Sequence, residues 1–305
     1  LGSRYCTVSQ SLGGSERQQV EAAASVKFSR EYRPRPQMAY VEEMMTAGGL
    51  RHYDVHQEQQ QKIDDSDFVS DYSTDFDSEH DHSDCECATS EDEAVVPRFT
   101  ADETLLILDW DDTLLPTSWI EAQGLRLGGG APITAEIRAH LDCLAERASL
   151  TLRLAKSYGT VVVVTNAEHG WIELSCQKFM PSLWDALQDV KLLSARSQFE
   201  RQGVAQPSAW KLLAFRDEIV PFFGVACGGS GAAPQRNIIS IGDSLHEREA
   251  LIRVTDRFPN SWAKALKLME KPSAEEFLKE HEVLCGVLGD IVNHMGNLDV
   301  SIHGP

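Results

Sequence analysis

Three carboxylates follow an apolar run in the segment TLLILDWDDTLLPTSW, residues 104–119. Asp109, Asp111 and Asp112 come directly after the run, and Thr113 is next in the chain. An aspartate at a strand end can attack phosphorus and form an aspartyl-phosphate. A second carboxylate two residues further on can protonate the leaving group and then activate water. This spacing therefore favours phosphoryl transfer, with an acidic turn after a strand as the alternative for Asp109, Asp111 and Thr113.

Polar residues at the ends of two later apolar runs suit the same chemistry. Thr165 follows the run VVVV, and a hydroxyl backed by a helix N-terminus can hold phosphoryl oxygens. Asp243 follows SIG and offers a hard oxygen, since clustered carboxylates favour Mg²⁺. Lys211, in SAWK, can offset the charge of a nucleophile and a phosphate together. Thr165 and Asn166 also fit a plain strand end and helix N-cap, and Lys211 also fits a surface lysine, with Lys191 as a weaker competitor.

The segments that must position these residues alternate between strand and helix from about residue 99 onward. Short runs rich in Leu, Val and Ile predict strands, and longer stretches with apolar residues at helical spacing predict helices. Thr134 is the expected N-cap of the first long helix, Gly159 its stop, and Pro181 the limit of the next helix. This alternation predicts an α/β fold in which helices cover both faces of a parallel sheet and ligands bind outside the carboxyl ends of the strands. The expected strands cover residues 104–110, 160–166, 189–196, 236–244 and 265–270, and the expected helices cover residues 132–159, 167–180, 208–223, 247–258 and 273–295.

Taken in order, these segments resemble the four motifs of the haloacid dehalogenase-like (HAD) hydrolase superfamily. ILDWDDTLL matches its Asp-x-Asp-x-Thr signature, and VVVVTN matches the strand that ends in Thr or Ser. SAWK supplies the lysine, and IISIGDSLHE matches a Gly-Asp pair followed by an acidic residue four positions after the Asp. The resemblance covers about residues 102–275 and none of residues 1–98. Because dehalogenase members lack the second Asp of the signature, Asp111 favours a phosphatase or a phosphotransferase.

The resemblance implies a Rossmann-like fold and a Mg²⁺-dependent phosphoric monoester hydrolase. In the family the first Asp is the nucleophile and a metal ligand, the second is the acid/base and gives the metal its backbone carbonyl, and the Asp of the fourth motif completes the coordination. Glu247 is then expected to contact and support these ligands without binding the metal itself, or to be only an acid in the first turn of a helix, favourable to the helix dipole. Asp112 is expected to be a solvated or supporting group. Carried onto this chain, the catalytic residues are Asp109 and Asp111, the phosphate-binding residues Thr113, Thr165, Asn166 and Lys211, and the metal ligands Asp109, Asp111 and Asp243.

The spacing of the motifs leaves no room for a large cap domain. Between Thr113 and Thr165 there are 51 residues, and between Thr165 and Lys211 there are 45. Only residues 116–132 remain as a flap, with Trp119 as a wall and Gly128–Gly130 as a hinge. An open site suits a phosphoprotein or another bulky phosphoester, so the chain resembles a capless phosphatase of the superfamily. The alternatives are a phosphotransferase, or a catalytically idle HAD-like scaffold whose acidic tail recruits partners.

Charge separates the chain into residues 1–98 and residues 99–305. The net charge is −19, and residues 64–93 hold 13 Asp and Glu with no Lys or Arg, so removing these 13 charges leaves −6 for the rest. Such a chain is not expected to bind nucleic acid. Residues 1–98 are expected to be largely disordered, because their polar and acidic sequence cannot bury enough apolar surface. This tail is the candidate site for a protein partner and for phosphorylation of its Ser and Thr residues.

The cysteines and the absence of long apolar runs bear on the compartment. Seven cysteines, odd in number and irregular in spacing, do not form a disulfide framework of the extracellular kind. No apolar run reaches the roughly 18 residues that a membrane span needs. We expect a cytoplasmic or nuclear protein without a membrane partner. Because the chain begins at Leu1, a targeting segment lost from its N-terminus stays open.

Overall fold

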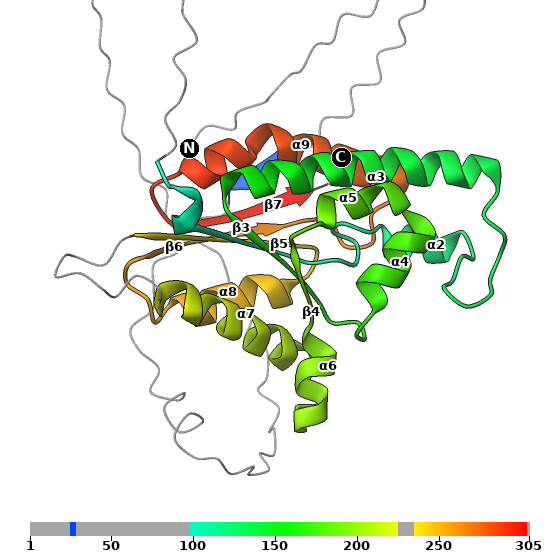
Figure 1. The fold of residues 1–305 in the computed structure, drawn as a ribbon. Coiled ribbons are helices and arrows are strands. Elements are labelled where there is room, and N and C mark those ends of the chain that lie inside the picture. The colour runs from blue at the N-terminus through cyan, green and yellow to red at the C-terminus, as the bar shows by residue number, and fades with distance from the viewer. Residues whose placement is uncertain (1–24, 29–97, 225–234, 304–305) are drawn as a thin grey trace, which may run out of the picture. The chain divides into compact units, whose positions relative to one another are not determined.

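A seven-stranded sheet forms the centre of the computed structural model, which describes residues 25–28, 98–224 and 235–303 (Figure 1). The strand order is β1-β7-β6-β5-β2-β3-β4, and neighbouring strands are parallel except for β1, which pairs antiparallel with β7. The parallel α/β sheet expected from the sequence is therefore confirmed. The strands are β1 (Ser25–Phe28), β2 (Thr104–Leu108), β3 (Thr160–Thr165), β4 (Lys191–Ser194), β5 (Arg236–Gly242), β6 (Ser261–Lys267) and β7 (Leu298–His303).

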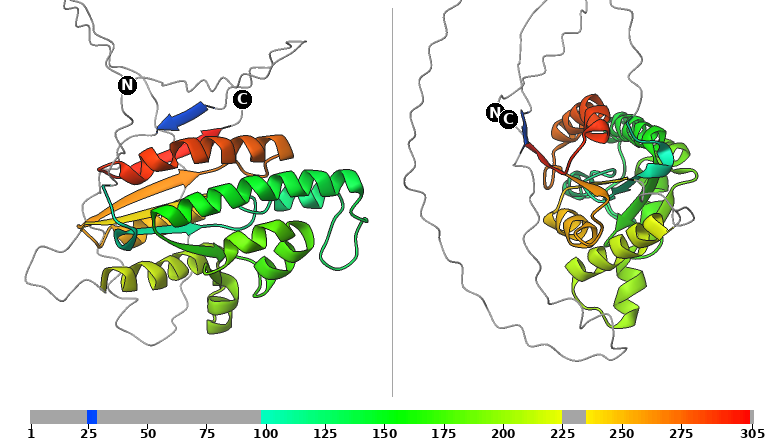
Figure 2. Two further views of the ribbon diagram at one scale, coloured as in Figure 1. Left: turned by 45° about the horizontal axis from the view of Figure 1, so that its top comes forward. Right: turned by 90° about the vertical axis from the view of Figure 1, so that its left-hand side faces the viewer.

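Helices cover both faces of this sheet. On one face α3 (Ala135–Tyr158) packs beside α9 (Ala274–Asn293), and on the other face α7 (Pro207–Gly224) packs beside α8 (Leu245–Thr255) (Figures 1 and 2). Between Thr113 and Thr165 the chain forms only α2, α3 and β3, so no separate domain is inserted there. The shorter helices are α2 (Thr117–Ala122), α4 (Trp171–Phe179), α5 (Trp184–Leu187) and α6 (Ala195–Phe199), with 3-10 turns η1 (Ala101–Glu103), η2 (Pro181–Leu183) and η3 (Glu200–Gln202).

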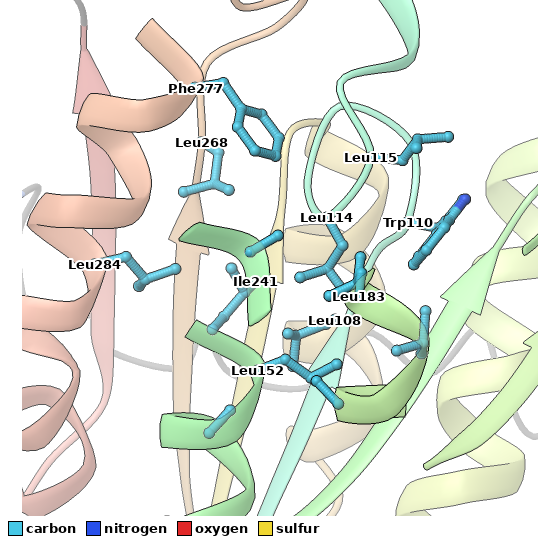
Figure 3. Packing of buried hydrophobic residues seen from close by; sticks show 14 of the residues in the cluster. Leu108, Trp110, Leu114, Leu115, Leu152, Leu183, Ile241, Leu268, Phe277 and Leu284 are labelled. Carbon is cyan, nitrogen blue, oxygen red and sulfur yellow. The ribbon is translucent and has the colours of Figure 1, made fainter. Parts of the chain in front are cut away.

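The core divides into two layers because strand side chains alternate between the faces. Leu106 and Leu108 of β2 pack into the cluster that contains residues of α3 and α9, which Figure 3 shows from close by. Leu105 and Ile107 point to the other face and pack with residues of α7 and α8. A strand that is buried on both faces needs apolar residues at every position, which explains the unbroken run of β2.

Local signals place the ends of α3 and α4. The side chain of Thr134 accepts a hydrogen bond from the backbone N–H of Ile137, so the predicted N-cap is confirmed. Gly159 ends α3, and a Cβ atom there would lie 2.3 Å from the carbonyl oxygen of Thr104. The prediction that α4 begins near residue 167 is wrong, because Gly170 adopts a left-handed backbone with φ 86 and the helix starts after it. α4 ends before Pro181, as predicted.

Further elements differ from the predictions. β6 covers Ser261–Lys267 and not residues 265–270, because it contains Lys264, which is fully buried in the sheet. β7 was not predicted, since its polar residues alternate with only two buried ones, Val300 and Ile302. The six-residue helix α2 lies in the segment that the sequence predicts as a flap.

The prediction of disorder for residues 1–98 lies outside the described residues, apart from β1 and Arg98. Within the described ranges, no helix combines the length and the apolar character needed to cross a membrane.

Candidate active site

The direction of the chain across the sheet reverses beside β2. From β2 the chain continues through β3 to β4 on one side, and it then returns to β5 on the other side of β2. Open α/β sheets bind ligands at this point, in the crevice outside the carboxyl ends of the strands. Asp109 follows β2 and Asp243 follows β5. The backbone N–H of Asp109 donates to the carbonyl of Ile241 at 2.9 Å, which continues the contact between the two strands as far as the site.

A buried lysine links two of the expected site residues. Lys211 Nζ, on α7, lies 2.6 Å from Oδ1 of Asp109 and 3.0 Å from Oε1 of Glu247 on α8. It also donates to the carbonyl of Val164 at 2.6 Å. The Lys211 side chain is only 1% exposed. The three oxygens named above are buried as well, and they match the three N–H groups of the lysine. Lys191, the competitor considered from sequence, instead pairs with Glu218 on the surface, 2.6 Å away.

Burial and neighbouring charges shift the pKa values of Asp109, Lys211 and Glu247. Burial raises the pKa of Asp109, and Glu247 and Asp111 raise it further, while Lys211 opposes them. Burial alone would lower the pKa of Lys211, but Asp109 and Glu247 raise it above its ordinary value. Burial also disfavours ionisation of Glu247, yet Lys211 and the Ser244 hydroxyl bring its pKa below the ordinary value. Lys211 is therefore held as a cation between carboxylates.

Asp243 brings a third carboxylate to the cluster. Single oxygen atoms of Asp109, Asp243 and Glu247 all lie within 4.8 Å of one another. Burial raises the pKa of Asp243 to about 7, helped by the charges of Glu247 and Asp112. Three carboxyl groups thus share one lysine, and the raised pKa values of Asp109 and Asp243 reflect burial together with this crowding of acidic groups. Such a group of oxygen atoms could hold a divalent cation.

Asp111 lies beside this cluster and receives three side-chain hydrogen bonds. Thr165 Oγ1 donates to its Oδ2 at 2.9 Å, and both Thr117 Oγ1 and Trp171 Nε1 donate to its Oδ1, at 2.7 and 2.8 Å. Thr165 in turn accepts from the backbone N–H of Ala167 at 2.9 Å. The donors come from the end of β3, from α2 and from α4. Three separate elements therefore fix the orientation of this carboxylate.

Asp112 contacts the start of α2, a contact that the sequence did not suggest. Its backbone is left-handed with φ 50, and its carboxylate accepts from the backbone N–H of Ser118 at 2.8 Å and from the Ser118 hydroxyl. The residue is 7% exposed, which excludes the solvated alternative of the prediction and leaves the supporting one. Because Ser118 is in the first turn of α2, Asp112 satisfies a free N–H at the start of that helix.

Two of the expected phosphate-binding residues have a polar side-chain atom without a hydrogen-bond partner among the described residues. Thr113 is 1% exposed, and among the described residues its hydroxyl has no hydrogen-bond partner. Its carbonyl accepts from Nε2 of His281 on α9 at 3.0 Å. Asn166 donates through Nδ2 to the carbonyl of Pro207 at 3.2 Å, and its buried Oδ1 has no partner in the described part of the chain. Their role toward phosphate stays a prediction.

The residues of the expected flap contact the body of the protein. Trp119 meets His140 edge to face, with ring centroids 6.2 Å apart. Gly129 and Gly130 have φ values of 78 and 87, a conformation that favours glycine. The hinge at Gly128–Gly130 stays a prediction.

Sequence reasoning found the charged residues of the site and missed Trp171 and Thr117. Both are ordinary residues near helix starts, and no motif points to them. One usable signal was their position a few residues after Asp111 and Thr165, where the chain leaves the carboxyl edge of the sheet.

Comparisons of the chain with protein-family models, curated proteins and solved structures find no match. Its function must therefore be argued from the site itself.

Proposed function

We propose that this chain is a HAD-like, Mg²⁺-dependent phosphatase that works through an aspartyl-phosphate at Asp109. The observation that carries the proposal is the arrangement of Asp109 beside Lys211, with Asp111 two residues further on and held by three donors. Asp109 and Asp111 follow the carboxyl end of β2, at the edge of the sheet where such folds bind their ligands.

In the first half-reaction Asp109 attacks the phosphorus of a phosphate monoester. Oδ1 of Asp109 is bound to Lys211, which leaves Oδ2 as the attacking oxygen. A bond forms between Oδ2 and phosphorus while the ester P–O bond breaks. The leaving oxygen takes a proton from the carboxyl group of Asp111 and departs as an alcohol. Lys211 offsets the negative charge of the nucleophile and the phosphoryl group.

In the second half-reaction water hydrolyses the aspartyl-phosphate. The carboxylate of Asp111 takes a proton from the water as its oxygen attacks phosphorus. The bond between phosphorus and Asp109 breaks, inorganic phosphate leaves, and the Asp109 carboxylate is restored. Asp111 has then regained the proton that it gave to the leaving group. The net reaction converts a phosphate monoester and water into an alcohol and phosphate.

The carboxylates of the site suit a Mg²⁺ ion. Asp109, Asp243 and Glu247 present hard oxygen atoms close together, and a divalent cation among them would favour the ionised forms of Asp109 and Asp243, whose pKa values are raised. Asp109 and Asp243 would hold the ion with the backbone carbonyl of Asp111, and Glu247 would support them through Lys211. A bound ion would neutralise the charge between the carboxylates and the phosphate. Thr165, Asn166 and Thr113 would complete the phosphate pocket.

The substrate is a phosphoprotein or another bulky phosphoester. The described chain has no domain inserted between Thr113 and Thr165, where a cap over the site would enter. Without such a cap, a phosphoryl group on a large molecule can approach the carboxyl ends of β2 and β5. A screen that compares phosphopeptides with small phosphorylated metabolites tests this part, and a clear preference for the metabolites would contradict it.

The phosphatase proposal is tested with purified protein, Mg²⁺ and a generic aryl phosphate. Wild-type protein should release phosphate, and Asp109→Asn should lower the rate by about four orders of magnitude or more, because it removes the nucleophile. A chelator should abolish the wild-type activity, and added Mg²⁺ should restore it. A wild type as inactive as Asp109→Asn on aryl phosphates, phosphopeptides and sugar phosphates would contradict the proposal and favour the scaffold alternative. Transfer of the phosphoryl group to an added alcohol would identify a phosphotransferase.

A further inference from the structure

Trp171 and Trp110 join α4 to the loop that carries the site aspartates. Trp110 stands between Asp109 and Asp111, and its indole N–H donates to Ser175 Oγ on α4 at 3.0 Å. Ser175 Oγ donates to the carbonyl of Trp171, one turn earlier in the helix, at 2.5 Å. The indole of Trp171 then reaches back to Oδ1 of Asp111 at 2.8 Å. Two indole groups thus connect the same loop and the same helix in opposite directions.

The three donors to Asp111 differ in what they can do when its proton moves. A hydroxyl such as that of Thr117 or Thr165 can turn and accept a hydrogen bond once the carboxyl group is protonated. The indole N–H of Trp171 can only donate, so Oδ1 must stay an acceptor. Thr117 and Trp171 both donate to Oδ1, so Oδ2, the oxygen on the Thr165 side, is the one left to exchange a proton with a substrate.

We propose that Trp171 is the positioning residue for Asp111 and holds its Oδ1, so that Oδ2 serves the leaving group of the substrate. This inference rests on the proposed phosphatase function. Its consequence concerns the substrate class, because a well-placed acid matters most for esters of alcohols, which are poor leaving groups. The arrangement fits phosphate esters of serine and threonine side chains better than aryl phosphates.

The test compares two substrates whose leaving groups differ. One is a phosphoserine peptide, and the other is 4-nitrophenyl phosphate, whose leaving group needs little protonation. The ratio kcat/KM covers the steps up to formation of the aspartyl-phosphate, so it excludes the later use of Asp111 as a base. Trp171→Phe should lower kcat/KM for the peptide by about tenfold or more and change the value for the aryl ester much less. In an Asp111→Asn background the same substitution should have no further effect.

Matched variants separate positioning from folding. Thr117→Val removes another donor to Oδ1 and should give the same selective loss in weaker form, while Thr117→Ser keeps the hydroxyl and should behave as wild type. If Trp171→Phe does not fold, benzothienylalanine at position 171 keeps the ring shape without the N–H and should show the selective loss. An equal loss on both substrates would overturn the role of Trp171 and leave the phosphatase proposal standing. A wild type without activity on either substrate would instead contradict the phosphatase proposal.

Discussion

Two lysines are buried in the part of the chain that the structure describes, and their surroundings are opposite. Lys211 contacts the carboxylates of Asp109 and Glu247, and its pKa lies above the ordinary value. Lys264, on β6, is 0% exposed and forms no ion pair with any described residue. Its Nζ donates to the carbonyl of Val292 at 2.8 Å and lies 5.0 Å from the centre of the Phe99 ring.

Burial lowers the pKa of Lys264 to about 7, so this lysine can lose its charge near neutral pH. Its contact with Val292 satisfies a carbonyl near the C-terminal end of α9, which is a structural role. Lys211 remains a cation because carboxylates surround it. Burial of a lysine is therefore no sign of function by itself. Retention of its charge, at the point where the strand order reverses, is the feature that indicates chemistry.

The largest expected difference is between Lys211→Met and Lys264→Met. Removing Lys211 leaves Asp109 and Glu247 buried without a counter-charge, which should cost about 3–5 kcal/mol of unfolding free energy. Removing Lys264 exchanges a buried amine for an apolar side chain of similar length, and the expected change is about 1 kcal/mol in either direction. Urea unfolding in the presence of a chelator measures both. Similar losses in the two variants would contradict the comparison.

The pH dependence of stability should distinguish the two lysines further. Between pH 7 and the ordinary lysine value of 10.5, folded Lys264 binds fewer protons than it does in the unfolded chain. Its contribution to stability should therefore grow as pH rises through this window, and it should be lost as pH falls toward 7. Unfolding curves of wild type and Lys264→Met, compared across the window, isolate this contribution. If the difference between the two proteins stays constant with pH, the pKa of Lys264 is not lowered.

The smallest expected effect concerns Asp112, the carboxylate beside the site that contacts α2. Asp112→Ala removes the hydrogen bonds to Ser118 and should destabilise the protein by about 1 kcal/mol. Asp112→Asn can still accept from the Ser118 N–H and suits the left-handed backbone, so it should lose less. Thermal unfolding measures the stability, and the rate with an aryl phosphate serves as the control. A rate as low as that of Asp109→Asn would show that Asp112 belongs to the chemistry.

Much of the fold could be predicted because its signals are local. The run that contains Leu105–Leu108 is apolar at every position, as a strand buried on both faces must be, and Thr134 and Gly159 delimit α3. β7 and the first half of β6 gave no such signal. Lys264 is polar by type and yet buried in β6, and β7 places only Val300 and Ile302 in the core. These strands depend on tertiary packing that no local pattern reports.

The same distinction holds for the site: some of its residues could be predicted from local sequence patterns, and some of its contacts depend on tertiary packing. Asp109, Thr165 and Asp243 could be located because the ends of parallel strands converge at one edge of the sheet. The hydrogen bond from Trp171 to Asp111 joins residues 60 positions apart and depends on the direction of an indole ring. The role of Asp112 depends on a positive φ angle. Side-chain direction and backbone conformation of this kind follow from the packed structure alone.

The most direct test of the central claim is detection of a phosphoryl group on Asp109. Asp111→Asn protein, mixed with Mg²⁺ and an aryl phosphate, is quenched in acid, digested and analysed by mass spectrometry. Because this variant lacks the base that activates water, the aspartyl-phosphate should accumulate on the peptide that contains Asp109, and Asp109→Asn should show none. Turnover by the wild type without any adduct, or an adduct at another residue, would contradict the assignment of Asp109 as the nucleophile.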